Sequence, residues 1–120
     1  MSKERVVLDA NVLYGAFLRD VLLSLFAVGL YEAKWTDQIN EEWGRNLLAN
    51  RPHINPDAIA RTVARMNQIN PSPLVEEYQH IVDQLNLPDP DDRHVLAAAI
   101  AAKAKKIVTW NLEDFPRRVG

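Results

Sequence analysis

The sequence contains no cysteine, and this absence excludes disulfide bonds and thiolate zinc sites. A long apolar run is also missing, since the longest hydrophobic stretch, residues 21–31, is interrupted by Ser24 and Gly29 and is too short to cross a bilayer. The N-terminal segment lacks the hydrophobic region and the small-residue cleavage site of a secretory signal. We therefore expect a cytoplasmic protein without a membrane span.

The chain also has few histidines and a small net charge. The chain has three scattered histidines, so any bound metal should be a hard cation on oxygen ligands, for which Mg²⁺ or Mn²⁺ fits best. With 14 Lys and Arg against 16 Asp and Glu, the net charge is -2, and any attraction for nucleic acid must be local. A length of 120 residues with 48% hydrophobic content allows one compact core, so we expect a single domain over residues 1–120.

Short apolar runs predict strands, and the segments between them have helical periodicity. The expected strands cover residues 5–8, 33–35 and 107–109. The first helix should begin at Asn11 and direct Leu13, Ala16 and Phe17 inward, and the later helices should cover residues 21–30, 37–50, 58–69 and 89–104. Residues 74–87 are expected to be mostly helical. The alternation predicts an α/β fold with a parallel sheet.

Acidic and amide residues fall where these strands end or where helices begin. They are Asp9, Glu42, Asp92, Asn111 and Asp114. Such ends converge at one edge of a parallel sheet, where these folds bind their ligands. Crowded carboxylates repel one another unless a cation lies among them. The pattern therefore predicts a metal-dependent phosphodiesterase site.

The first two candidates also have structural explanations. Asp9 could simply cap the helix that follows it. The run Asp9-Ala10-Asn11 resembles the opening motif of haloacid-dehalogenase phosphatases, but Asn11 replaces the second Asp, which is their general acid. Glu42 could be an ordinary solvated glutamate, yet helical geometry places it at the flank of the apolar stripe, whereas Glu41 points away.

The acidic run at residues 89–92 has the composition of a helix start, with Asp89 as the N-cap and Pro90 in the first turn. Capping does not explain why Asp92 falls on the inward face of its helix, where a carboxylate is costly without a partner. This orientation favours a functional role for Asp92. Asn111 and Asp114 could simply form a turn after the last strand.

The histidines and tryptophans carry no separate signal of function. None of the histidines has metal-ligand spacing, and we expect surface positions for His53, His80 and His94. Packing in the core or at its rim is a better explanation than base stacking for Trp35, Trp43 and Trp110.

Three segments occur in the order VVLDANVLYGAF, INEEW and LPDPDDRHVLAAAIAAKAKKIVTWNLEDF. Together they resemble PIN-domain proteins of the kind that act as the VapC-type ribonuclease toxin of a toxin–antitoxin pair. The resemblance covers essentially the whole chain. It implies a three-layer α/β/α sandwich with a parallel sheet of about four strands and a site at the carboxyl ends of the strands.

The resemblance also implies roles for the acidic residues. One or two Mg²⁺ or Mn²⁺ ions would be held by Asp9, Glu42 and Asp92, with Asp89 at a further acidic position of the family. Asn111 occupies the fourth site position, and Asp114 is the nearby acid that could replace it. The implied reaction is endonucleolytic hydrolysis of RNA by a water that the ions activate.

The partners implied by the resemblance are an RNA substrate and an antitoxin protein, and the family is compatible with a homodimer. Contacts with the RNA backbone are assigned to cations around the rim, namely Arg45, Arg51, Lys103 and Arg117. PIN domains usually continue into another strand, whereas this chain stops at Gly120. We therefore expect the last strand to be absent or another chain to cover the edge of the sheet.

Two alternatives from other functional classes remain. A Mg²⁺-dependent phosphatase or phosphoacceptor would also gather acids at strand ends, with Asp9 as the nucleophile. A catalytically silent PIN-like binding module would bind a partner without cleaving RNA.

Overall fold

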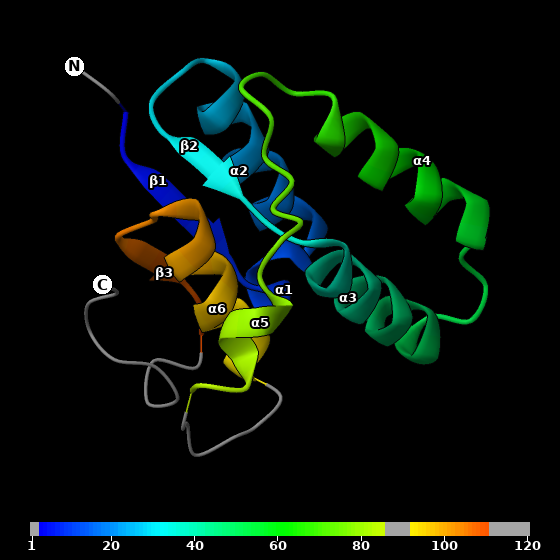
Figure 1. The fold of residues 1–120 in the computed structure, drawn as a ribbon. Coiled ribbons are helices and arrows are strands. Elements are labelled where there is room, and N and C mark those ends of the chain that lie inside the picture. The colour runs from blue at the N-terminus through cyan, green and yellow to red at the C-terminus, as the bar shows by residue number, and fades with distance from the viewer. Residues whose placement is uncertain (1–2, 86–91, 111–120) are drawn as a thin grey trace.

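The computed structural model describes residues 3–85 and 92–110 (Figure 1). Within this part of the chain, three parallel strands form one sheet in the order β2-β1-β3. The strands are β1 (Arg5–Leu8), β2 (Glu32–Lys34) and β3 (Lys106–Val108). The parallel α/β prediction is confirmed, and the last two strands lie one residue earlier than expected. The sheet has one strand fewer than the four that the resemblance suggested.

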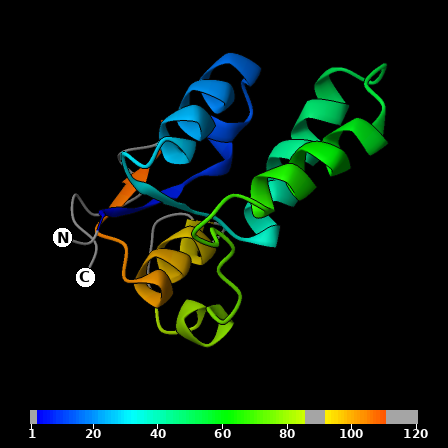
Figure 2. The same cartoon turned by 90° about the horizontal axis from the view of Figure 1, so that it is seen from above.

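Six helices surround this sheet in the described part of the chain. They are α1 (Ala10–Leu13), α2 (Ala16–Ala27), α3 (Asp37–Asn50), α4 (Pro56–Asn67), α5 (Gln79–Val82) and α6 (Arg93–Ala102). The helix α2 covers one face of the sheet and α6 with α5 covers the other, while α3 and α4 form a pair beside it (Figure 2). No helix among the described residues is both long and apolar enough to span a membrane.

The central strand β1 is the most buried strand because it has a neighbour on each side and helices on both faces. Val7 and Leu8 have no exposed surface. The β-branched residue Val6 pairs with Ala33 on β2 and with Lys106 on β3. The apolar run that predicted this strand therefore reflects burial on both faces.

The first helical region differs from the prediction. The helix stops after Leu13 and a new one starts at Ala16, with Gly15 as its N-cap. Phe17, which was expected to point inward, is 82% exposed. The helix α2 carries two apolar stripes, and the core accepts the one that contains Leu22 and Phe26. Periodicity alone could not decide which stripe faces the sheet.

The prediction of a mostly helical segment at residues 74–87 is also wrong. Leu74 forms a parallel bridge with Trp35, just beyond β2. The backbone N–H of Trp35 donates to the carbonyl of Pro73 (3.0 Å), and the N–H of Val75 donates to the carbonyl of Trp35 (2.8 Å). Because these backbone groups pair with an extension of the sheet, only the four residues of α5 are helical in the described part of this segment.

The helix α3 has the bounds that its sequence predicted. Thr36 caps it, since the hydroxyl oxygen accepts a hydrogen bond from the backbone N–H of Ile39 (3.0 Å). Trp43 is buried on the inner side of α3. The guanidinium of Arg19 lies 4.6 Å from the centre of the Trp43 ring, so a cation–π contact joins α2 to α3.

Tyr31 gives the fold a predicted dependence on alkaline pH. Its hydroxyl donates to the carbonyl of Leu22 (2.7 Å), and burial raises its pKa to about 12. The unfolded chain should lose this proton near pH 10. The stabilising contribution is therefore fully present below about pH 10 and is lost as the pH rises towards about 12.

We predict that the Tyr31→Phe variant loses less stability than the wild type over this pH range. Urea unfolding at a series of pH values measures the free energy of unfolding of both proteins. Identical pH slopes above pH 10 would contradict the assignment to Tyr31.

Candidate functional site

The carboxylate of Asp9 lies at the carboxyl end of β1, and the residue is only 4% exposed. Its Oδ1 accepts a hydrogen bond from the backbone N–H of Ala10 (2.7 Å) at the start of α1. Its Oδ2 accepts from the hydroxyl of Thr109 (2.9 Å), which directly follows β3. Asp9 therefore contacts a helix start, as capping predicts, and also links the ends of two neighbouring strands.

Asn11 extends this contact to the backbone after β3. Its Nδ2 donates to the hydroxyl oxygen of Thr109 (3.0 Å), and its Oδ1 accepts from the backbone N–H of Trp110 (3.2 Å). The amide thus orients the Thr109 hydroxyl toward Asp9. Each carboxylate oxygen can accept about two hydrogen bonds or ligands, so Asp9 retains acceptor capacity beyond these contacts.

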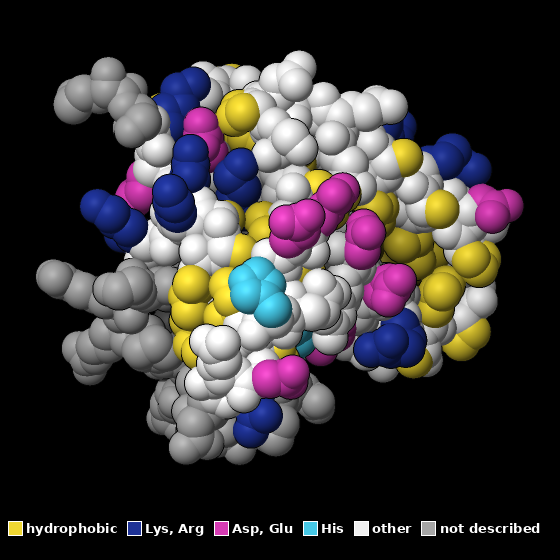
Figure 3. Space-filling view, in the orientation of Figure 1, with side chains coloured by type: hydrophobic (Ala, Val, Ile, Leu, Met, Phe, Trp, Pro, Cys, Tyr) yellow, Lys and Arg dark blue, Asp and Glu magenta, His cyan; other side chains and the backbone are white. Residues whose placement is uncertain are grey.

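Glu42 borders a cleft of about 540 Å³ between α3 and the α5–α6 layer. The cleft is lined by Asp37, Gln38, Glu41, Glu42, Arg45, Tyr78, Gln79 and His94. Acidic side chains form a band across this face of the molecule (Figure 3). Glu42 is half-buried and Glu41 is exposed, as the helical geometry predicted.

His94 is 6% exposed, which corrects its predicted surface position. The sequence placed it opposite the apolar stripe of α6, but α5 packs against α6 on the side away from the sheet. Residues 94–99 are consequently all buried, and a second covered side cannot be seen in the periodicity of one helix. His53 and His80 are exposed, as predicted.

Asp92 is partly buried at the N-cap position of α6, and within the described residues its side chain makes no capping hydrogen bond. Capping therefore does not account for its position. His94 lies in the same first turn and borders the cleft of Glu42, so the start of α6 lies beside α3. Asp89 falls outside the described residues.

The three elements that carry the predicted metal ligands adjoin one another. Asp9 precedes α1, α1 packs against α3, and α3 faces the start of α6. Among residues 3–85 and 92–110, however, no three Asp, Glu or His side chains form a group that could hold a metal ion. Asp89, Asn111 and Asp114 lie outside this part of the chain. The metal site therefore remains a prediction.

The profile of the PIN-domain family matches residues 5–113. This chain is a PIN domain. PIN domains are generally nucleases, and the matched region contains Asp9, Glu42, Asp92 and Asn111, while Asp114 lies one residue beyond it. No curated protein sequence matches the chain.

The cations assigned to RNA contacts occupy different parts of this PIN domain. Arg45 borders the cleft of Glu42, whereas Arg51, at the end of α3, borders a separate pocket of about 340 Å³. Lys103 follows the last turn of α6, about 16 Å from Asp92 along a helix that rises 1.5 Å per residue. Arg117 lies outside the described residues.

Thr109 and Trp110 contribute to the site although the sequence prediction gave them no site role. The sequence feature that could have indicated this role is the position of Thr109. It directly follows β3, as Asp9 directly follows β1, and both strands are parallel. Trp35 and Trp43 are buried, as predicted, but Trp110 is 71% exposed and packs in neither the core nor its rim.

The contact between Thr109 and Asp9 predicts a measurable cost for Thr109→Val. Valine keeps the shape of threonine but removes the hydroxyl donor, so a buried carboxylate oxygen loses its hydrogen bond. We expect a decrease of about 1–3 kcal/mol in the free energy of unfolding, measured by urea denaturation. Thr109→Ser, which keeps the donor, is the control and should lose less. Wild-type stability in Thr109→Val would contradict the role of this hydrogen bond.

Proposed function

We propose that this PIN domain is a metal-dependent endoribonuclease and that it acts as the VapC-type toxin of a type II toxin–antitoxin pair. The observation that carries the proposal is the buried carboxylate of Asp9, held between Ala10 and Thr109 at the carboxyl edge of the sheet. Membership in a nuclease family supports it. The cytoplasm is the compartment that a toxin acting on cellular RNA requires.

The chemistry of the donor set fits a hard divalent cation. Asp9, Glu42 and Asp92 offer carboxylate oxygens, and the chain has no cysteine. These three residues would hold Mg²⁺ or Mn²⁺, with Asp89 as a further donor. When bound, such an ion lowers the pKa of water and neutralises negative charge on the phosphate.

The protein groups around Asp9 would keep the site in one geometry. The hydroxyl of Thr109 and the backbone N–H of Ala10 fix both carboxylate oxygens, and Asn11 fixes Thr109 in turn. A carboxylate that is held before substrate arrives needs no reorganisation during the reaction. Asn111, or Asp114 in its place, would orient the attacking water.

Backbone contacts would fix the position of the RNA without selecting its sequence. Of the assigned cations, Arg45 has the most suitable place, because it borders the cleft of Glu42. Arg51 and Arg117 are the further proposed contacts, and an antitoxin protein is the proposed regulatory partner.

A second candidate is a catalytically silent binding module. One observation favours it, namely that no group of three potential metal ligands exists among residues 3–85 and 92–110. The phosphoacceptor alternative uses Asp9 as a nucleophile, and hydrogen bonds to both of its carboxylate oxygens make them less nucleophilic.

The nuclease proposal predicts that the protein cleaves a mixed pool of tRNA and rRNA with Mg²⁺ or Mn²⁺ but not with EDTA. Asp9→Asn, Glu42→Gln and Asp92→Asn should each lower the cleavage rate by at least about 100-fold, since each removes a charge that would act on the transition state. Gel electrophoresis of the RNA over time gives the rates.

Glu76→Gln is the matched control, because Glu76 is exposed and does not border the cleft of Glu42. It should retain nearly full activity. Cleavage that persists in EDTA and in Asp9→Asn would refute the mechanism. Calorimetry measures the binding of Mn²⁺ to the wild type and to Asp92→Asn. Binding that is weaker in Asp92→Asn would show that a metal site exists even if no cleavage is observed.

The toxin proposal predicts that induced expression arrests bacterial growth and that Asp9→Asn abolishes the arrest. Co-expression of a small DNA-binding protein encoded beside this gene should restore growth. Colony counts after induction measure both effects. Unimpaired growth, at expression levels confirmed by blotting, would contradict a toxin role while leaving the nuclease assay unaffected.

A further inference from the structure

Four of the five lysines of this PIN domain lie at the amino ends of the strands, whereas Lys34 is the last residue of β2. All five are among the described residues: Lys3, Lys34, Lys103, Lys105 and Lys106. Figure 3 shows Lys and Arg side chains gathered on the side of the molecule that carries the described N-terminal residues. The net charge of the chain is -2, so this concentration is local.

A basic pocket of about 440 Å³ lies at the centre of this region. It is lined by Lys3, Glu4, Arg5, Lys103 and Lys105, which are four cations and one acid. Lys103 and Lys105 form no ion pair with any acidic side chain in the described part of the chain. The basic pocket therefore retains an excess of positive charge.

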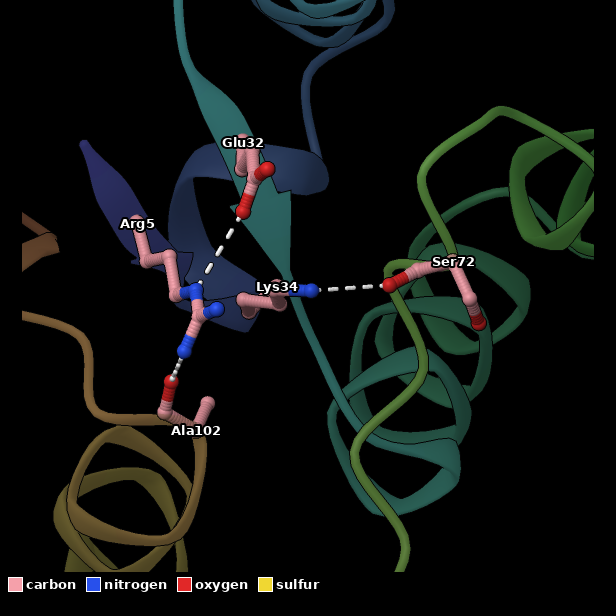
Figure 4. Close-up of polar contacts among 5 residues, drawn as sticks. All are labelled: Arg5, Glu32, Lys34, Ser72 and Ala102. Carbon is pink, nitrogen blue, oxygen red and sulfur yellow. Dashed lines mark hydrogen bonds and ion pairs between the residues drawn. The ribbon is translucent and has the colours of Figure 1, made fainter. Parts of the chain in front are cut away.

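The acidic side chains around the basic pocket compete only weakly with a polyanion for its cations. Arg5 pairs with Glu32 (3.3 Å) and also donates to the carbonyl of Ala102 (3.1 Å), as Figure 4 shows. Lys106 pairs with Glu4 (3.3 Å). Exposed pairs of this kind contribute about 0–1 kcal/mol, so phosphate groups can replace them at little cost.

Lys34 is not part of the basic pocket. Its ammonium donates to the carbonyl of Ser72 (2.8 Å) in Figure 4. Burial lowers its pKa, with Glu32 acting in the opposite direction and Arg5 in the same direction. Acidic side chains of Glu76 and Glu77 border the same surface. The polyanion surface is therefore better assigned to the β3 side, away from Lys34.

The strand β3 leads from the basic pocket to the candidate site. Exposed and buried residues alternate along it, so Lys106, Val108 and Trp110 face outward while Thr109 faces Asp9. At about 3.3 Å per residue, the outward row is about 13 Å long. The backbone N–H of Trp110 donates to Oδ1 of Asn11 (3.2 Å). Trp110, which is 71% exposed, therefore lies beside the Asp9–Thr109 contact.

We propose that the basic pocket, Lys106 and Trp110 together form a binding track for a single strand of RNA. The basic pocket takes the phosphates, and the indole of Trp110 stacks on a base where the strand reaches the Asp9 edge. Cationic grooves with an aromatic platform bind single strands in this way without reading sequence. This proposal rests on the proposed function, because it takes RNA as the substrate. It places Lys103 in the basic pocket, where it would bind RNA phosphates, and not at the rim of the cleft of Glu42.

The aromatic platform separates this proposal from binding of an acidic polypeptide. Carboxylate side chains can satisfy lysines, but they provide no flat ring to stack on an exposed indole. Trp110 and the lysines should therefore both contribute to RNA binding, whereas only the lysines should contribute to the binding of a polyanion without bases.

The test is fluorescence anisotropy of labelled oligouridylates with the full chain in EDTA, which removes metal-dependent cleavage and leaves binding. Oligomers of about 4 and about 16 nucleotides bracket the usual range of single-strand site sizes. The longer one should bind more tightly, since it can contact more of the lysines at the same time as Trp110. Trp110→Ala should weaken its binding by about 5- to 150-fold, and Trp110→Phe should restore most of it.

The double variant Lys103→Glu/Lys105→Glu should lower affinity and reduce the slope of log K against log salt by about 1.4, the value for two lost phosphate contacts on a single strand. Arg61→Glu/Arg65→Glu is the matched control. It makes the same charge change on the exposed face of α4 and should leave the slope and affinity unchanged. Circular dichroism verifies that each variant is folded.

The outcomes separate the track from the nuclease proposal. RNA binding that depends on Trp110 and Lys103/Lys105, in a protein that cleaves nothing with Mn²⁺, would support the track and contradict the enzyme. Cleavage with wild-type RNA affinity in the track variants would overturn the track alone. Equal loss of RNA affinity in the α4 control would also overturn it. So would polyglutamate binding as tight as RNA binding, together with no effect of Trp110→Ala on RNA affinity.

Discussion

The parallel pairing of β1 with β3 is the constraint on which the candidate site depends. Leu8 pairs with Val108, and the backbone N–H of Asp9 donates to the carbonyl of Val108 (3.1 Å), so the two strands end together. This register brings Asp9 and Thr109, which are 100 residues apart, within hydrogen-bond distance. A slip of one residue would turn either side chain to the opposite face of the sheet and separate them.

Burial on both sides of the sheet explains why that register is well defined. The residues of β1 from Val6 to Leu8 are enclosed between α2 and α6, and residues 94–99 of α6 are enclosed in turn by α5. The cleft of Glu42 lies where these layers meet α3. Thr36 caps α3, and the Arg19–Trp43 contact joins α3 to α2. The packing of apolar layers thus determines where Glu42 and the first turn of α6 lie.

The sequence predicted the elements whose signals are local. The bounds of β1 and α3 follow from a β-branched run and from an N-cap with a regular apolar stripe, and the side of Glu42 follows from helical geometry. The family was also recognisable from three segments in order, which the profile match confirms. For the candidate site, Asp9 beside the end of a parallel strand was predictable. The contact with Thr109 was not predicted, because it depends on the pairing of β3 with β1.

What the sequence could not predict depends on partners distant along the chain. The core accepts one of two apolar stripes on α2, which leaves Phe17 exposed, and α5 covers the far side of α6, which buries His94. Residues 74 and 75 are extended because Trp35 offers backbone groups to pair with.

The gathering of four of the five lysines at the amino ends of the strands has a practical consequence. Reagents that couple to lysine amines would attach this protein to a surface mainly by that end, since the remaining lysine, Lys34, donates to the carbonyl of Ser72. Asp9 follows the opposite end of β1. Most molecules immobilised in this way would present the carboxyl ends of the strands to the liquid.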